Sequence, residues 1–249
     1  MNLDLNDYFL TALIFCAAML YASVGHAGAS GYIAAMALFG VAPAVMKPAA
    51  LALNILVATI ATIKFYRVRA FSWPLLWPLA MTSVPCAFIG GLITLPGNLY
   101  KPLVGVVLVY SAWRAFAIAN ESKPGPCVPP SPPVLAGIGA ALGLLSGLTG
   151  VGGGIFLSPL LLLNRWAETK TVAGVSAAFI LVNSIAGLAG VVAARSITLA
   201  PALPLWAAAA VVGGYIGAEL GSRRFGNPTI RRLLALVLLI AGVKMILAV

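Results

Sequence analysis

The residues best suited to chemistry lie in two glycine-rich segments, YASVGHAGASGY at residues 21–32 and SGLTGVGGGIF at residues 146–156. The first contains His26, the single histidine of the chain. Glycine inside a helix costs about 1 kcal/mol relative to alanine, so each segment is expected to interrupt a helix. The N–H groups that begin the following helix carry partial positive charge and have no partner within that helix. The predicted chemistry is therefore the binding of an anion by backbone amides.

The amides that would bind the anion belong to Ser30–Gly31–Tyr32 in the first segment and Gly153–Gly154–Ile155 in the second. Small side chains there would let an anion approach the backbone closely. Small residues also allow membrane helices to pack tightly, and that explanation would suffice for one isolated segment. Two segments at matching positions of a repeated sequence favour an anion site.

Polar residues at helical spacing accompany each segment. Asn54 shares a stripe of small residues with Ala50, Ala58 and Ala61, and Ser176, Asn183 and Gly187 form a similar stripe in the second half. Asn54 and Asn183 could donate hydrogen bonds to an anion, or they could bond to a neighbouring helix. The candidate substrate-binding residues are Ser23, His26, Gly28, Ser30, Gly31, Asn54, Thr149, Gly150, Gly152, Gly153, Gly154, Ser176 and Asn183.

Other ionisable residues have two interpretations each. His26 could bind the anion or carry a proton, because free histidine titrates near pH 6.5, or it could be a packed core residue. Glu219 could carry a proton, although an ion pair with Arg223 one turn further on is the simpler expectation. Lys47 and Lys170 match between the halves and sit at helix ends, where anchoring to lipid headgroups is expected.

The composition places these segments in a membrane protein. The chain is 62% hydrophobic and 8% charged, with a mean hydropathy of +1.07, whereas soluble proteins carry about 25% charged residues. Apolar runs long enough to cross a bilayer recur along the sequence. The net charge of +10 comes from short basic clusters between these runs, which indicates cytoplasmic loops rather than nucleic-acid binding. The acidic start MNLDLNDY lacks the positive charge of a secretory signal, so the first apolar segment is expected to remain in the mature protein.

The chain divides into two similar halves. Residues 1–118 and 134–249 are predicted to be membrane repeats, joined by a proline-rich linker at 119–133. A shift of 123 residues aligns Ser23 with Ser146, Gly31 with Gly154 and Lys47 with Lys170. Each repeat contains a glycine-broken helix pair and three long helices. These long helices are expected at about 48–66, 72–95 and 100–118, and again at about 170–193, 203–222 and 230–248.

The basic residues choose between two topologies. If each glycine segment turns the chain back, each half crosses the membrane an odd number of times, and the halves are inverted. Of the fifteen basic residues, this arrangement puts eleven on one side and four on the other, whereas parallel repeats would divide them eight to seven. Cytoplasmic loops carry an excess of Lys and Arg. We therefore predict an all-α polytopic protein of two inverted repeats, with both termini outside the cytoplasm.

The segment GLTGVGGGIFLSPLLLL, residues 147–163, resembles the TauE/SafE family of sulfite-exporter-like membrane proteins, whose repeats carry a G-x-G-G-G segment followed by a proline. Gly150, Gly152, Gly153, Gly154 and Pro159 stand in those places. GHAGASGY at 25–32 is similar to the matching first-half segment, although Gly-Ala-Ser replaces the glycine triplet. KPAALALNILVATIATIKFYR at 47–67 also resembles family members, and the similarity extends over nearly the whole chain. The resemblance implies transport of small sulfur-containing anions such as sulfite or organosulfonates, without nucleotide hydrolysis.

The predicted function is therefore a secondary carrier or facilitator for a small anion in a bacterial inner membrane. An anion channel of similar build is the alternative, because broken helices occur in both. A membrane-embedded enzyme would need a nucleophile and a base, or metal ligands, and one histidine with five acidic residues offers little for either. No cofactor is expected. The expected partners are the anion, membrane lipid and a coupling proton or sodium ion, while the oligomeric state is left open.

Overall fold

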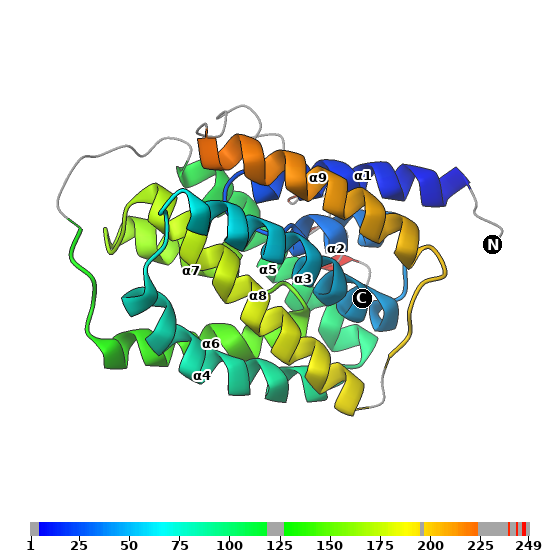
Figure 1. Cartoon of the computed structure of the whole chain (residues 1–249). Coiled ribbons are helices and arrows are strands. Elements are labelled where there is room, and N and C mark those ends of the chain that lie inside the picture. The colour runs from blue at the N-terminus through cyan, green and yellow to red at the C-terminus, as the bar shows by residue number, and fades with distance from the viewer. Residues whose placement is uncertain are drawn as a thin grey trace.

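The computed structural model describes residues 5–118, 127–194 and 197–223, with the single residues 239, 243, 246 and 247. Within these residues the regular structure is entirely α-helical, and Figure 1 shows its arrangement. The helices are α1 (Leu5–Ala22), α2 (Ala29–Leu38), α3 (Pro43–Arg67), α4 (Trp73–Leu92), α5 (Gly97–Ile118), α6 (Pro132–Thr149), α7 (Gly154–Leu163), α8 (Thr169–Ala193) and α9 (Leu203–Arg223).

The predicted long helices are found close to their expected positions. The largest difference is at α3, which begins at Pro43 rather than near residue 48. Pro43 occupies the first turn, where a missing N–H costs nothing, and Pro48 is accommodated inside the helix. The helix expected at 230–248 lies outside the continuously described residues. Six described helices, α1, α3, α4, α6, α8 and α9, are long and apolar enough to cross a membrane, so this is a multi-pass membrane protein.

Helices α3 and α8 form the centre of the bundle. Their most apolar windows are 61% and 67% buried, against 33–39% for the other four candidate spans. They run side by side in opposite directions, because Gly174 near the start of α8 contacts Phe65 near the end of α3, while Gly187 further along α8 contacts Leu51 (Figure 1). Equivalent helices of two repeats run antiparallel when the repeats are inverted, so this geometry supports the predicted inversion.

The outer helices of each half pack on helices of the other half. Helix α4 packs on α6 and α8, and α9 packs on α1 and α3. In both outer pairs glycines spaced four residues apart meet the partner backbone: Gly139, Gly143 and Gly147 of α6 meet α4, and Gly213, Gly217 and Gly221 of α9 meet α1. A β-carbon added at Gly217 would lie 1.9 Å from the carbonyl oxygen of Met19. Small residues at these positions therefore allow the close helix contacts that hold membrane bundles together.

Basic residues gather at one end of the bundle. The end of α3 meets the end of α9 through an ion pair between Lys64 and Glu219, and Ala70 after α3 contacts Gly174 near the start of α8. The basic residues that the structure describes at this end are Lys64, Arg67, Arg69, Arg165 and Lys170. This distribution agrees with the side that the sequence analysis assigns to the cytoplasm.

Both glycine segments interrupt a helix and reverse the chain. Helix α2 returns along α1, so that Gly31 contacts Ala17 and Tyr21. After the second break, helix α7 packs mainly on α8, and its N-cap, Gly153, approaches the carbonyl oxygen of Leu142 and the side chain of Ser146 in α6. We call residues 23–28 the first break and residues 150–153 the second break.

Candidate functional site

The second break lies between the two central helices. Gly150, Gly152 and Gly153 have φ values of 81°, 84° and 77°, in the left-handed region that glycine adopts without strain. Gly153 is the N-cap of α7, and no side chain among the described residues caps it by a hydrogen bond. Because the residues of this break are buried, the first N–H groups of α7 point into protein rather than into solvent.

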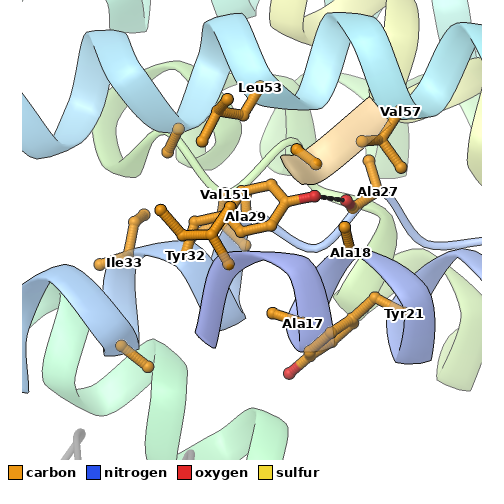
Figure 2. Packing of buried hydrophobic residues seen from close by; sticks show 14 of the residues in the cluster. Ala17, Ala18, Tyr21, Ala27, Ala29, Tyr32, Ile33, Leu53, Val57 and Val151 are labelled. Carbon is orange, nitrogen blue, oxygen red and sulfur yellow. Dashed lines mark hydrogen bonds between the residues drawn. The ribbon is translucent and has the colours of Figure 1, made fainter. Parts of the chain in front are cut away.

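The first break has a similar backbone conformation, but a tyrosine side chain lies against it. Its N-cap, Gly28, has a φ of 106°, and again no described side chain caps the start of α2. The Tyr32 hydroxyl donates to the carbonyl oxygen of Ala27, and the ring lies against Gly28. Figure 2 shows Tyr32 among buried side chains that include Val151 of the second break. The two breaks therefore border the same hydrophobic cluster.

Asn54 is buried against the second break. Its Nδ2 lies 3.4 Å from the carbonyl oxygen of Val151 and 3.4 Å from Oγ of Ser184. A β-carbon added at Gly152 would lie 2.7 Å from the same Nδ2, so only glycine fits there. The donor group of Asn54 is thus directed at the protein, while its Oδ1 is buried without a hydrogen-bond partner among the described residues.

Asn183 and Ser176 lie on α8. The Nδ2 of Asn183 donates to the carbonyl oxygen of Phe179 at 2.9 Å, and its Oδ1 is buried with no partner in the described chain. Ser176 shares a 2.7 Å hydrogen bond with Ser158 of α7, and its carbonyl oxygen would lie 3.4 Å from a β-carbon at Gly154. Both amide nitrogens face carbonyl oxygens of the protein, as the alternative of hydrogen bonding within the helix bundle predicts. Donation to an anion by the second N–H of either amide stays a prediction.

Most of the remaining candidate substrate-binding residues form hydrogen bonds to residues close by in the sequence. The Ser23 hydroxyl donates to the carbonyl oxygen of Leu20. Thr149 donates to Leu145 and accepts from the N–H of Val151. The half-buried His26 has Nδ1 3.2 Å from the carbonyl oxygen of Val24 and meets Tyr21 edge to face. Gly28, Ser30 and Gly31 lie at the start of α2, and Gly154 at the start of α7.

Two hydroxyl groups that the sequence analysis did not select lie beside the half-helix starts. The Ser146 side chain approaches Gly153, with its Cβ 3.5 Å from a β-carbon added there, and Tyr21 contacts Gly31. Both hydroxyl groups are buried, and that of Ser146 has no partner in the described residues, whereas that of Tyr21 lies beside the Ser30 side chain. The alignment of Ser146 with Ser23 was the available sequence signal for one of them, whereas Tyr21 had none. Each half-helix start is therefore bordered by a buried hydroxyl that can donate a hydrogen bond.

Lys47 is not a headgroup anchor. Its side chain is 8% exposed, and its ammonium donates to the carbonyl oxygens of Gly90, Gly91 and Ile93 at the end of α4. Its backbone and the aliphatic part of its side chain contact Gly150 of the second break. Lys170, the equivalent lysine, is exposed as expected. The matching positions therefore have different roles in the two halves.

Glu219 forms an ion pair that the sequence did not predict. Its carboxylate bonds to Lys64 of α3, whose ammonium also lies 4.1 Å from the ring centroid of Tyr215. The side chain of Arg223, the expected partner, lies outside the described residues. A cavity of about 330 Å³ is found elsewhere, lined in part by Ser72, Leu135, Trp166 and Thr171. It lies at the starts of α4, α6 and α8, apart from both breaks.

Comparison with known proteins identifies the family. The family model described as "Sulfite exporter TauE/SafE" matches residues 10–245. The chain belongs to this family. It is 40% identical to the "Probable membrane transporter protein y4hK" of Sinorhizobium fredii (strain NBRC 101917 / NGR234) over 247 residues, which cover 98% of this chain and 100% of the relative. No solved structure matches. As a TauE/SafE protein, the chain is a membrane transporter, and both glycine breaks lie within the matched region.

Proposed function

We propose that this protein moves a small sulfur-containing anion, such as sulfite or an organosulfonate, across a bacterial inner membrane as a secondary carrier or facilitator without catalytic activity. The observation that carries the proposal is the pair of buried half-helix starts at Ala29 and Gly154, neither capped by a described side chain. In lipid, interrupted helices are tolerated where protein or a polar cavity satisfies their backbone. Half-helix N-termini of transporters bind anionic groups in this way.

Charge and hydrogen bonding at the breaks support an anion held mainly by the backbone. No lysine or arginine lies within either break, and the ammonium of Lys47, which borders the second break, is bound to three carbonyl oxygens. The anion would be bound by the amides at Ser30, Gly31, Gly153 and Gly154. The hydroxyl groups of Tyr21 and Ser146 would add a donor at each start.

Uptake by the purified protein in proteoliposomes tests this function. We expect radiolabelled sulfite or an organosulfonate such as sulfoacetate to accumulate faster than in empty vesicles, with saturable kinetics and competition between the two. Sulfate and thiosulfate in the same panel define the selectivity. Flux that rises linearly with concentration favours the channel alternative, and the absence of flux for every sulfur anion would contradict the proposal.

The orientation proposed for the chain places both termini outside and the interrepeat linker in the cytoplasm. In a variant with Cys16 and Cys86 replaced by serine, Cys127 is the single thiol, and it is exposed. An impermeant maleimide is expected to label Cys127 in inside-out vesicles and after lysis, but not in intact cells. Labelling of Cys127 from outside intact cells would overturn the inverted topology.

A role for His26 at the first break predicts a change in pH dependence. Replacing His26 with glutamine removes a titratable ring and keeps a polar side chain of similar size. The pH profile of uptake is expected to flatten between about pH 5 and 8, where histidine normally titrates, with unchanged folded yield. A variant with the original profile would assign His26 to packing against Tyr21 alone.

A further inference from the structure

We propose that the second break also holds a monovalent metal cation, sodium, bound by the amide oxygens of Asn54 and Asn183 and the hydroxyl of Ser146. The inference rests on the proposed function, because the cation would be the coupling ion carried with the anion. It concerns different atoms, except at Ser146, whose hydroxyl proton would face the anion and whose oxygen would bind the cation. The anion is assigned to N–H and O–H donors, whereas the cation is assigned to oxygen atoms that accept.

The first step is the orientation of the two amide side chains. Each Nδ2 faces a backbone carbonyl oxygen, Val151 for Asn54 and Phe179 for Asn183. A carbonyl oxygen only accepts hydrogen bonds, so the nitrogen rather than the oxygen of each amide must face it. Each Nδ2 has two N–H donors, and Asn183 uses one of them on Phe179. The atom of each asparagine that is left without any partner is Oδ1, which only accepts. Both residues are 0% exposed, and both Oδ1 atoms are unpartnered within the described residues.

The second step is that these atoms border one place. Asn54 contacts Gly152, and Ser146 approaches Gly153. Asn183 is one turn from Phe179 and Ile180 along α8, and these two residues contact Gly153 and Gly154 respectively. Ser146 is 0% exposed, and its Oγ has no partner among the described residues. The unpartnered oxygen atoms of Asn54 and Ser146 therefore border the second break, and helical spacing places Asn183 on the adjoining face of α8.

The third step is the chemistry of this set. Buried acceptors without partners are costly and repel an anion, whereas a cation satisfies several at once. The end of α6 at Thr149 adds the partial negative charge of a helix C-terminus, and transporters bind sodium at such unwound segments. All the ligands are neutral, and no group of three His, Cys, Asp or Glu side chains suited to a metal occurs in the described residues. A singly charged ion fits this set better than a divalent one.

A proton does not fit the same place. Amides and aliphatic hydroxyl groups do not titrate at physiological pH, and the described part of the chain places two titratable side chains at or beside this break. Tyr100 donates to the carbonyl oxygen of Thr149, and Lys47 contacts Gly150 through its backbone and stem. The Lys47 ammonium is held by carbonyl oxygens of α4, and Asn54 lies about two turns, roughly 10 Å, further along α3.

Thermal unfolding of the purified full chain in detergent tests the cation site without any sulfur anion. Sodium chloride replaces choline chloride at constant chloride and ionic strength. The midpoint of unfolding is expected to rise with sodium and to saturate, as binding to the folded state requires, and choline is expected to have no effect. Equal midpoints in sodium and choline would overturn the site. Normal anion uptake in that case would leave the proposed function intact.

Asn164 offers a matched control. Its Nδ2 donates to the carbonyl oxygen four residues earlier at 2.8 Å, as that of Asn183 does at 2.9 Å, but Asn164 is exposed. Asn183→Ala is expected to raise the sodium concentration for half-maximal stabilisation at least tenfold, whereas Asn164→Ala leaves it unchanged. Ser146→Ala, a smaller change, is expected to weaken the response several-fold and serves if Asn183→Ala does not fold. A folded Asn183→Ala or Ser146→Ala protein with the wild-type sodium response would contradict the assignment.

Discussion

Replacing Gly154 with valine is expected to abolish anion uptake while leaving a protein that still inserts and folds. A β-carbon at this position would lie 2.3 Å from Cδ1 and 2.5 Å from Cγ1 of Ile180, the flexible end of a side chain that can move aside. The two methyl groups of valine would then cover the first N–H groups of α7. If backbone amides hold the anion, the initial rate of uptake should fall at least a hundredfold.

Two further variants separate a blocked site from a damaged fold. Gly137→Val adds the same side chain to α6, where nothing lies within 4 Å of the new β-carbon, and should retain uptake. Ser30→Ala removes one hydroxyl but keeps its amide, so its loss should not exceed a single hydrogen bond to a charged group, about 1.5–3 kcal/mol. Gel filtration reports folding and proteoliposome flux reports function. A monodisperse Gly154→Val protein with normal uptake and affinity would refute an anion site at α7.

Replacing Lys47 with methionine is expected to destabilise the protein strongly. The ammonium donates to three carbonyl oxygens at the end of α4, at 3.1, 3.3 and 3.0 Å, and methionine fills a similar volume without a donor. Carbonyl groups at a helix end inside a membrane protein have few other partners. The loss should be on the order of 3 kcal/mol, visible as a lower unfolding midpoint and a lower folded yield.

Lys170→Met is the control for this effect. Lys170 occupies the equivalent position of the second repeat but is exposed, so its replacement should change the unfolding midpoint little. Equal midpoints for the two variants would show that Lys47 is an interfacial anchor, as its sequence position first suggested. A large loss confined to Lys47→Met would establish it as the residue that holds α3 to α4 beside the second break.

The difference between these lysines shows that equivalent positions of the two repeats can have different roles. A shift of 123 residues aligns Lys47 with Lys170 and Tyr32 with Ile155, yet Lys47 is buried and Tyr32 fills the first break. The two breaks are therefore similar in backbone and different in side chains. This difference explains why we assign the cation to the second break alone.

The sequence by itself determined the class of protein, the positions of the two breaks and most helix boundaries. These features depend on properties that are local in the chain: hydropathy sets which segments lie in lipid, and glycine sets where a helix can stop and reverse. The distribution of lysine and arginine also predicts inverted repeats, and the antiparallel course of α3 and α8 is consistent with that prediction, which thiol labelling tests. The family motif in the second half added the class of transported solute as an expectation.

The tertiary structure alone decided which atom of each polar side chain remains available. Asn54 faces Val151, 97 residues away, and Lys47 faces Gly90, 43 residues away. No local pattern encodes such partners, because they arise when helices from different parts of the chain pack together. The sequence showed each asparagine in a stripe of small residues and left two roles open, donation to an anion or a hydrogen bond to a neighbouring helix. Packing directs their N–H groups to carbonyl oxygens and leaves the oxygen atoms of Asn54 and Asn183 as buried acceptors.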